Sequence, residues 1–375
     1  MIAGSPSAGE RELERELLVN MGPQHPSTHG VLRVIVRLNG ENVVECRPDI
    51  GYLHRCFEKI CEEWNYLQIG ALSDRNDYIA SLANEFAYYT ALERLVGIEV
   101  PERADFIRVI MAELQRISSH LVWYGTFALD LGATTPFLWA FREREVLLDL
   151  FEAATGARLT YNFFRPGGVR NDLPAGFDRE VKKFLEVMEQ RIGEYDKILT
   201  GNRIFVARTK GVATLTAAEA VAYGASGPTL RGSGVDWDLR RDAPYSVYDR
   251  FQFEVCTAPE GDCLARYHVR MNEIRQSIRI VRQALEGLPE GDFRGKTPKA
   301  IRPKGEVYMR TESPRGEIGV YLRGEGGPGP YRLKWRSPSF VHLQLLPLVG
   351  PRGLKVADLV AFIGSIDIVL GEVDR

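Results

Sequence analysis

The sequence PERADFIRVIMAELQRISSHLVWYGTFALDL, residues 101–131, predicts one helix of unusual length. Its apolar residues recur in alternating steps of three and four, which is the pattern of a seam that faces another helix. A second stripe carries Trp123, Phe127 and Asp130 near the end of the same helix. Because the helix is apolar on two sides there, we expect it to be central, with the rest of the chain organised around it.

Helical periodicity extends on both sides of this segment, from about residue 53 to about residue 288. The further predicted helices are residues 55–72, 76–96, 135–155, 177–199, 216–224 and 262–288. The Gly-, Ser- and Pro-rich residues 224–234 are predicted to form a loop. Five arginines of the last helix, from Arg266 to Arg282, predict a solvated face, with a partner interface as the alternative.

Strand patterns occupy both ends of the chain. Residues 31–38 alternate apolar and polar side chains, Asn39-Gly40 suits a tight turn, and residues 43–44 return, which predicts a β-hairpin. Short strands are predicted at residues 306–310, 317–323 and 331–336, followed by an apolar helix or buried segment at residues 356–370.

These patterns predict an α+β fold in which both ends share a sheet layer around a large helical bundle. The predicted divisions are a flexible arm at residues 1–17, an N-terminal β region at 18–52, the helical bundle at 53–288, a linker at 289–304 and a C-terminal α/β region at 305–375. We expect them to form one integrated unit.

Composition excludes several classes of function. A net charge of −2 and a pI near 6.4 give no general field for binding nucleic acid. Five cysteines form no dense framework in 375 residues, and no secretory signal is visible, so a reducing compartment is expected. Residues 356–370 contain Asp358 and Asp367 and are shorter than the roughly 20 residues that a membrane span needs. We expect a soluble or peripheral protein.

A stiff polar turn precedes the hairpin, at residues 22–30 with the sequence GPQHPSTHG. Its prolines exclude a helix, so His25 and His29 act from a loop. Asp130 continues the aromatic stripe of the central helix and must be paired or neutralised there, because an isolated buried charge is too costly. An imidazolium is one such partner, and a His–Asp pair fixes the ring tautomer and gives a proton donor near neutral pH. Alternatively, His29 is an ordinary turn residue and Asp130 caps a helix or binds an arginine.

Two other sets of side chains could carry chemistry. Tyr78 lies in the first turn of the predicted helix 76–96, off its apolar stripe, so its hydroxyl can point into a cleft. Cys56 and Cys61 could be half of a metal site, but residues five apart lie on different faces of a helix and no second pair follows. We therefore expect buried thiols that behave as small hydrophobes and no bound metal.

Eight motifs, in this order, closely resemble one known family, which is the quinone-site D subunit of the proton-pumping NADH:quinone oxidoreductase, respiratory complex I. The motifs are NMGPQHPSTHGVLR (20–33), GYLHRCFEKI (51–60), DRNDY (74–78), RVIMAELQRISSHL (108–121), FRERE (141–145), RPGGVR (165–170), LRGSG (230–234) and GSIDIVLGEVDR (364–375). The family is similar in fold to the large subunit of nickel–iron hydrogenases, so the resemblance implies a hydrogenase large-subunit-like fold.

The resemblance also implies a site. His29 and Tyr78 match the family's quinone-binding residues, and Asp130 matches the aspartate paired with that histidine. Arg55 and Arg75 match arginines that face the terminal iron–sulfur cluster of a neighbouring small subunit. Thr160 stands beside that cluster where the family commonly has a histidine.

The implied role is quinone reduction within a multisubunit enzyme that couples electron transfer to proton translocation, with no cofactor bound covalently by this chain. The implied partners are the small iron–sulfur subunit, other peripheral-arm subunits and a membrane-arm subunit at the quinone entry. The implied location is peripheral, on the cytoplasmic side of the cell membrane. The alternatives are the same type of subunit fed by ferredoxin or deazaflavin, a hydrogenase-like metalloenzyme, or a scaffold without redox work.

Overall fold

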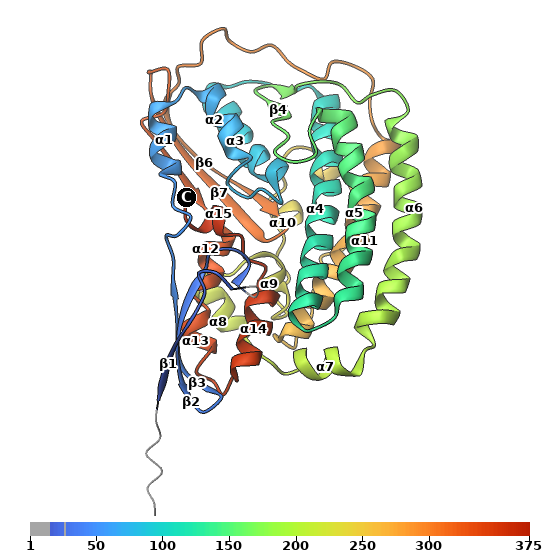
Figure 1. Ribbon diagram of the computed structural model, residues 1–375. Coiled ribbons are helices and arrows are strands. Elements are labelled where there is room, and N and C mark those ends of the chain that lie inside the picture. The colour runs from blue at the N-terminus through green and yellow to red at the C-terminus, as the bar shows by residue number, and fades with distance from the viewer. Residues whose placement is uncertain (1–15, 26–27) are drawn as a thin grey trace, which may run out of the picture.

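The computed structural model describes residues 16–25 and 28–375, so nearly all of the predicted arm at residues 1–17 lies outside the described residues. Figure 1 shows long helices side by side in a bundle, with strands and short helices against it. The α+β prediction is confirmed.

The predicted central helix is confirmed as α4 (Glu102–Asp130). It packs against α5 (Thr134–Thr155) and α11 (Cys263–Glu286), and α6 (Phe177–Tyr195) covers α5 and α11 on the far side (Figure 1). Gly156, in the left-handed conformation that glycine adopts without strain, ends α5, in agreement with the helix predicted at residues 135–155. A π-helical turn at Asp196–Thr200 continues α6.

The chain before α4 differs from prediction in two places. The single helix predicted at residues 55–72 is two helices, α1 (Phe57–Glu63) and α2 (Tyr66–Ser73), because the Asn65 side chain accepts hydrogen bonds from the Leu67 and Gln68 amides and starts a new helix. The next helix, α3, is Ser81–Val96. Tyr78 therefore lies in the loop before a helix and not in a first helical turn.

Two predictions about the second half of the bundle are also wrong. The loop predicted at residues 224–234 contains α9 (Gly227–Arg231), which follows the correctly predicted α8 (Ala217–Ala222) and its capping box. Arg266 and Arg270, assigned to a solvated face of α11, are completely buried, because they donate hydrogen bonds to Ser365 and to carbonyl oxygens inside the fold. Two short helices complete this part of the chain, α7 (Arg203–Thr209) and α10 (Leu239–Asp242).

The strands form separate antiparallel sheets. The predicted hairpin is β2 (Arg33–Asn39) with β3 (Asn42–Asp49), and β1 (Leu17–Met21), which was not predicted, pairs with β2. The three predicted C-terminal strands are confirmed as β6 (Lys304–Ser313), β7 (Gly316–Glu325) and β8 (Arg332–Arg336), and β4 (Phe164–Arg165) pairs with β5 (Gly168–Val169). The prediction that both ends of the chain share a sheet layer is wrong. After β8 the chain forms helices before it reaches the N-terminal sheet at Leu354 and Lys355.

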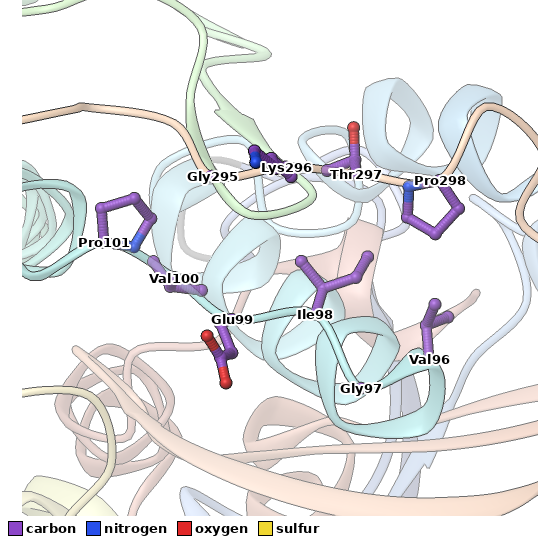
Figure 2. A pocket seen from close by; sticks show the side chains of 10 residues that line it. All are labelled: Val96, Gly97, Ile98, Glu99, Val100, Pro101, Gly295, Lys296, Thr297 and Pro298. Atoms are coloured by element: carbon purple, nitrogen blue, oxygen red, sulfur yellow. The ribbon is translucent and has the colours of Figure 1, made fainter.

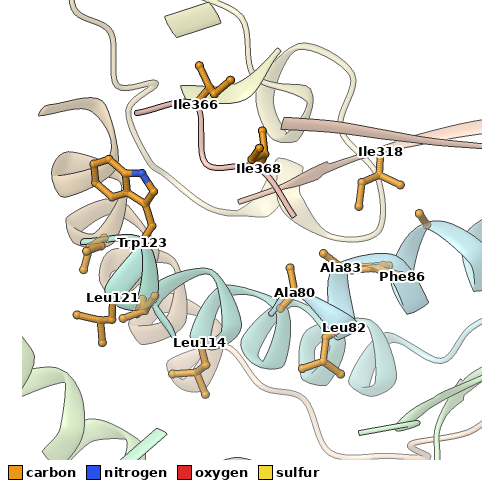
Figure 3. Packing of buried hydrophobic residues seen from close by; sticks show 14 of the residues in the cluster. Ala80, Leu82, Ala83, Phe86, Leu114, Leu121, Trp123, Ile318, Ile366 and Ile368 are labelled. Atoms are coloured by element: carbon orange, nitrogen blue, oxygen red, sulfur yellow. The ribbon is translucent and has the colours of Figure 1, made fainter. Parts of the chain in front are cut away.

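Four helices follow β8 and return the chain to α4. They are α12 (Pro338–Leu343), α13 (Leu346–Val349), α14 (Val356–Ser365) and α15 (Leu370–Val373). Figure 3 shows Ile366 and Ile368 in one apolar cluster with Trp123 of α4, Ala80 and Leu82 at the start of α3, and Ile318 of β7. The last residues of the chain are therefore held between the bundle and the C-terminal sheet.

One continuous hydrophobic core runs through the N-terminal sheet, the bundle and the C-terminal region. The division of the chain at residues 289–304 stays a prediction. No helix in the described part of the chain is both long and apolar enough to cross a membrane.

Candidate functional site

The structure brings His29 and Asp130 together. The His29 Nε2 atom lies 2.8 Å from Asp130 Oδ2, and the two side chains are 13% and 9% exposed. His29 has a φ of 50°, in the left-handed region that is uncommon for residues other than glycine. The completely buried Thr28 holds the turn by donating its hydroxyl to the His25 carbonyl at 2.8 Å. The turn thus presents one imidazole edge to the end of α4.

Asp130 is positioned by the stripe that precedes it and by α14. Trp123 and Phe127 stack with ring centroids 5.1 Å apart, and the Trp123 indole donates to the Gly364 carbonyl at 2.8 Å. A Cβ atom on Gly364 would lie 2.8 Å from Phe127 Cδ2 and 3.2 Å from Asp130 Oδ2. Because such contacts are closer than a side chain tolerates, the absence of a side chain at Gly364 allows α14 to close over Asp130.

Tyr78 lies in the loop between α2 and α3, against α15. A Cβ atom on Gly371 would lie 3.5 Å from Tyr78 Cε1 and 2.5 Å from the Asn76 carbonyl oxygen, so Gly371 packs directly on this loop. Within residues 16–25 and 28–375 the Tyr78 hydroxyl has no hydrogen-bond partner and is free to bind a ligand. Partial burial raises the pKa of Tyr78, and the neighbouring Asp77 carboxylate raises it further.

His29 and Tyr78 are related through the last segment of the chain. Asp130, the partner of His29, packs against Gly364, and Tyr78 packs against Gly371. The segment between these two glycines contains Ile366 and Ile368 of the core cluster in Figure 3. The two candidate residues are therefore positioned by opposite ends of one short buried segment.

The predicted cluster-facing residues gather near the α2–α3 loop. Arg55 donates to the Arg75 carbonyl at 2.8 Å, and both side chains reach solvent. The loop that carries Thr160 is tied to the same place, because the Asn162 amide donates to Asp74 Oδ2 at 2.6 Å. Thr160 has a φ of 52° and donates its hydroxyl to the Leu159 carbonyl at 2.7 Å. The two exposed guanidinium groups of Arg55 and Arg75 thus form a small cationic surface at the α2–α3 loop, with Arg75 Nη1 3.9 Å from Oδ2 of the buried Asp74.

The sequence reasoning missed a buried ionic group behind Tyr78. Arg315, in the β6–β7 turn, lies 2.6 Å from Asp77 and 3.6 Å from Asp367, and all three side chains are nine-tenths or more buried. Glu372, completely buried in α15, is a fourth member through its electrostatic interaction with Asp77 and Arg315. The signal was present in the sequence, because Asp367 and Glu372 interrupt an apolar run and acidic groups in such a run need partners.

A larger buried ionic network fills the space between α4, α11 and the C-terminal sheet. The members are Glu113, Arg116, His120, Arg231, Asp238, Arg240, Glu273 and Glu312. Burial opposes the charged form of Glu113, but Arg116 and Arg240 outweigh it and lower its pKa. His120 lies 2.9 Å from Glu273, which also binds Arg231 at 2.7 Å. Because each charge has an opposite partner, this network orders the interior that supports the site.

The cysteine pair does not form a metal site. Cys61 is buried and its burial raises its pKa to about 12, whereas Cys56 is exposed at the start of α1. In the described residues no three His, Cys, Asp or Glu side chains come together in a way that could hold a metal ion. Cys61 therefore behaves as a small core residue.

A surface cavity of about 610 Å³ lies elsewhere, between the end of α3 and residues 295–298. Figure 2 shows that it is lined by Val96 to Pro101 and by Gly295 to Pro298. Its charged side chains are Glu99 and Lys296, and none of the candidate residues lines it. This cavity is therefore separate from the site built on His29 and Tyr78.

Comparison with known proteins identifies the family of the chain. Residues 130–303 and 293–375 match the family described as the 49-kDa subunit of respiratory-chain NADH dehydrogenase. The chain is 53% identical to the second D subunit of NADH-quinone oxidoreductase from Symbiobacterium thermophilum, across 97% of this chain and 99% of that protein. It is 53% identical to the D subunit from Geobacillus kaustophilus, across 96% and 98% of the two chains, and 50% identical to the D subunit from Bacillus anthracis over the same shares.

The matches run through nearly the whole chain, including the turn, α4 and the C-terminal segment, and define a component of a multisubunit respiratory oxidoreductase. The chain belongs to the family of the 49-kDa subunit, also called the D subunit, of respiratory-chain NADH dehydrogenase, complex I.

Proposed function

We propose that this chain forms the quinone-reduction site of an NADH:quinone oxidoreductase and couples electron transfer there to proton translocation. The observation that carries the proposal is the 2.8 Å hydrogen bond between His29 and Asp130. A mostly buried imidazole whose orientation is fixed by a carboxylate can present a proton to a bound substrate.

The chemistry of a quinone explains why two donors are needed. A quinone carries two carbonyl oxygens at opposite ends of its ring, and reduction by two electrons develops negative charge on both. Each oxygen therefore needs a hydrogen-bond donor that can also transfer its proton. In this proposal His29 serves one oxygen and Tyr78 serves the other.

The direction of the His29–Asp130 bond assigns the two ring nitrogens. An ionised carboxylate only accepts hydrogen bonds, so Nε2 keeps its hydrogen toward Asp130 Oδ2. The other nitrogen, Nδ1, then transfers the proton to the substrate oxygen. After the transfer Asp130 holds the neutral ring in the tautomer with hydrogen on Nε2, ready to take up a new proton at Nδ1.

The cationic surface of Arg55 and Arg75 supports the second part of the proposal. Electrons reach the site from an iron–sulfur cluster that a small neighbouring subunit carries. Two positive charges beside such a cluster favour its reduced form. In this proposal Thr160, which cannot titrate in this pH range, also faces that subunit. The other partners are further peripheral-arm subunits and a membrane-arm subunit at the quinone entry, which place the chain peripherally on the cytoplasmic side of the membrane.

Substitution of His29 in the assembled complex tests the proposal. We expect His29→Ala to abolish NADH:quinone turnover while the cluster is still reduced by NADH. The matched control is His268→Ala, a half-buried histidine on α11 whose ring meets that of Tyr267 edge to face. Undiminished quinone turnover in the His29→Ala variant would contradict the assignment of His29 to the quinone site.

A further inference from the structure

Any tyrosine that gives its proton to a substrate must regain one before the next turnover. The Tyr78 ring is backed by Gly371, and the next residue along the chain is the completely buried Glu372. Glu372 belongs to the four-residue group of Asp77, Arg315, Asp367 and Glu372, which we call the Arg315 cluster. The cluster includes Asp77, which precedes Tyr78 in the chain. It also includes Glu372, which follows Gly371, the residue that packs on the Tyr78 ring.

The distances within the Arg315 cluster are those of a connected ionic group. Arg315 Nη1 binds Asp77 Oδ2 at 2.6 Å and the Ser119 hydroxyl at 3.3 Å, and Arg315 Nη2 lies 3.6 Å from Asp367 Oδ1. The other Asp77 oxygen accepts hydrogen bonds from the Ile79 and Ala80 amides at 3.1 Å, which fixes the loop that carries Tyr78. The cluster is therefore rigidly joined to Tyr78 through the backbone.

Glu372 has unused hydrogen-bonding capacity. Its Oε1 accepts from the Ser339 amide at 3.0 Å, but its buried Oε2 has no partner in the described chain. Arg315 Nε and Asn76 Oδ1 are likewise buried without a hydrogen-bond partner there, and Asp367 Oδ2 accepts no hydrogen bond but lies 4.0 Å from Arg270 Nε. Buried polar atoms of native proteins are nearly always satisfied, by ordered water where the protein offers nothing. The atoms belong to the Tyr78 loop, the β6–β7 turn and the last segment of the chain, and in the inference below they form, with ordered water, a polar path between Glu372 and the Tyr78 loop.

We infer that Glu372 is the internal proton donor that restores Tyr78 after Tyr78 has protonated the substrate. The inference rests on the proposed quinone site. The Tyr78 O–H bond breaks and its proton goes to a quinone oxygen, while the two electrons come from NADH through the redox centres of the complex. The Glu372 O–H bond then breaks, its proton passes along the polar path to the Tyr78 oxygen, and Glu372 becomes a carboxylate that later takes a proton from solvent.

The charges around Glu372 suit this role. Burial, and after it the Asp77 carboxylate, raise the pKa of Glu372 to about 7, although the Arg315 guanidinium and the hydrogen bonding of Ser339 act in the opposite direction. Arg375, at the end of the chain, also interacts with Glu372. A carboxyl group with a pKa near the working pH holds a proton before the reaction and can release it during the reaction. Arg315 stabilises the carboxylate that remains.

Glu372→Gln in the assembled complex is the primary test. The amide oxygen of Gln can still accept from the Ser339 amide, but the side chain cannot give up a proton. We expect at least a ten-fold lower turnover with quinone, an unchanged quinone KM, a larger solvent isotope effect, and undiminished electron transfer from NADH to an artificial acceptor. The control is Glu325→Gln, an exposed glutamate at the end of β7.

The outcomes separate this inference from the proposed function. Normal turnover and a normal isotope effect in Glu372→Gln, with an inactive Tyr78→Phe variant, would overturn the proton donor and leave the quinone site intact. A fully active Tyr78→Phe variant would overturn both. If Glu372→Gln does not assemble, infrared difference spectra of the wild-type complex, with ¹³C-labelled glutamate in single turnover, should show a glutamic acid losing its proton. Spectra without that signal would refute the inference.

Discussion

His29 and Asp130 are 101 positions apart in the chain and are joined by a 2.8 Å hydrogen bond between Nε2 and Oδ2. One partner comes from a turn before the first hairpin and the other is the last residue of α4. The bond therefore fastens the N-terminal turn to the end of the central helix. In the proposed function, Nδ1 of His29 is then the ring atom that faces the substrate.

Asp130→Asn tests the chemical consequence of this bond. An Asn amide carries no negative charge and can turn either its oxygen or its nitrogen toward the ring, so the variant no longer fixes the hydrogen of His29 on Nε2. We expect quinone turnover to fall while NADH still reduces the cluster. The measurement is quinone turnover of assembled complexes, and full turnover in the variant would count against the pairing.

Gly364→Ala tests the position of Asp130 without changing any ionisable group. The added methyl group would press on Phe127 and on Asp130 Oδ2, so one of them must move. We expect a destabilisation of about 1–3 kcal/mol, typical of overpacking, together with a loss of quinone turnover.

Gly193→Ala is the matched control for that change. Gly193 is also helical, in α6, but a Cβ atom there meets nothing within 4 Å. This variant should keep full turnover. Equal activity of the Gly364→Ala and Gly193→Ala variants would show that α14 does not hold Asp130 in place.

Much of the fold could be predicted from periodicity, and the reasons for the failures are specific. The 29-residue helix α4 and the hairpin have patterns long enough to exclude alternatives. The break at Asn65 was missed because a capping box inside a helical pattern competes with continuation of that pattern. Arg266 and Arg270 were placed in solvent because sequence periodicity cannot show the buried carbonyl groups that bind them.

The candidate site, like the fold, could be predicted from the sequence only in part. His29 and Asp130 could be paired on chemical grounds, because a carboxylate on an aromatic stripe needs a partner. Arg315 could not be found in this way, since its turn between β6 and β7 has no pattern that points toward Asp77. Contacts between side chains 238 positions apart depend on the tertiary fold.

Arg75→Gln tests the cationic surface. Arg75 is 47% exposed in its side chain and has Arg55 bound to its carbonyl. Removing a positive charge near the neighbouring cluster should make its reduced form less favourable, so we expect a lower midpoint potential. Redox titration of the cluster in the assembled complex measures this. An unchanged potential would exclude Arg75 from the surface that faces the cluster.

The buried His342 should make the stability of the chain fall in acid. Burial lowers the pKa of His342 from 6.5 to about 3, so the folded state binds fewer protons than the unfolded state between these values. Stability from this group is present above pH 6.5 and is lost as the pH falls toward 3, by about 1.4 kcal/mol per pH unit. His342→Gln should remove this slope, as measured by urea unfolding of the full chain at several pH values. Equal slopes in the two proteins would contradict the prediction.

The central claim is that the quinone ring lies between His29 and Tyr78. Photolabelling of the assembled complex with a photoreactive quinone, with and without an excess of ordinary quinone, tests it most directly. We predict label in the segments that contain His29 and Tyr78, and loss of that label under competition. Competed label that is confined to other segments, with both of these unlabelled, would contradict the claim.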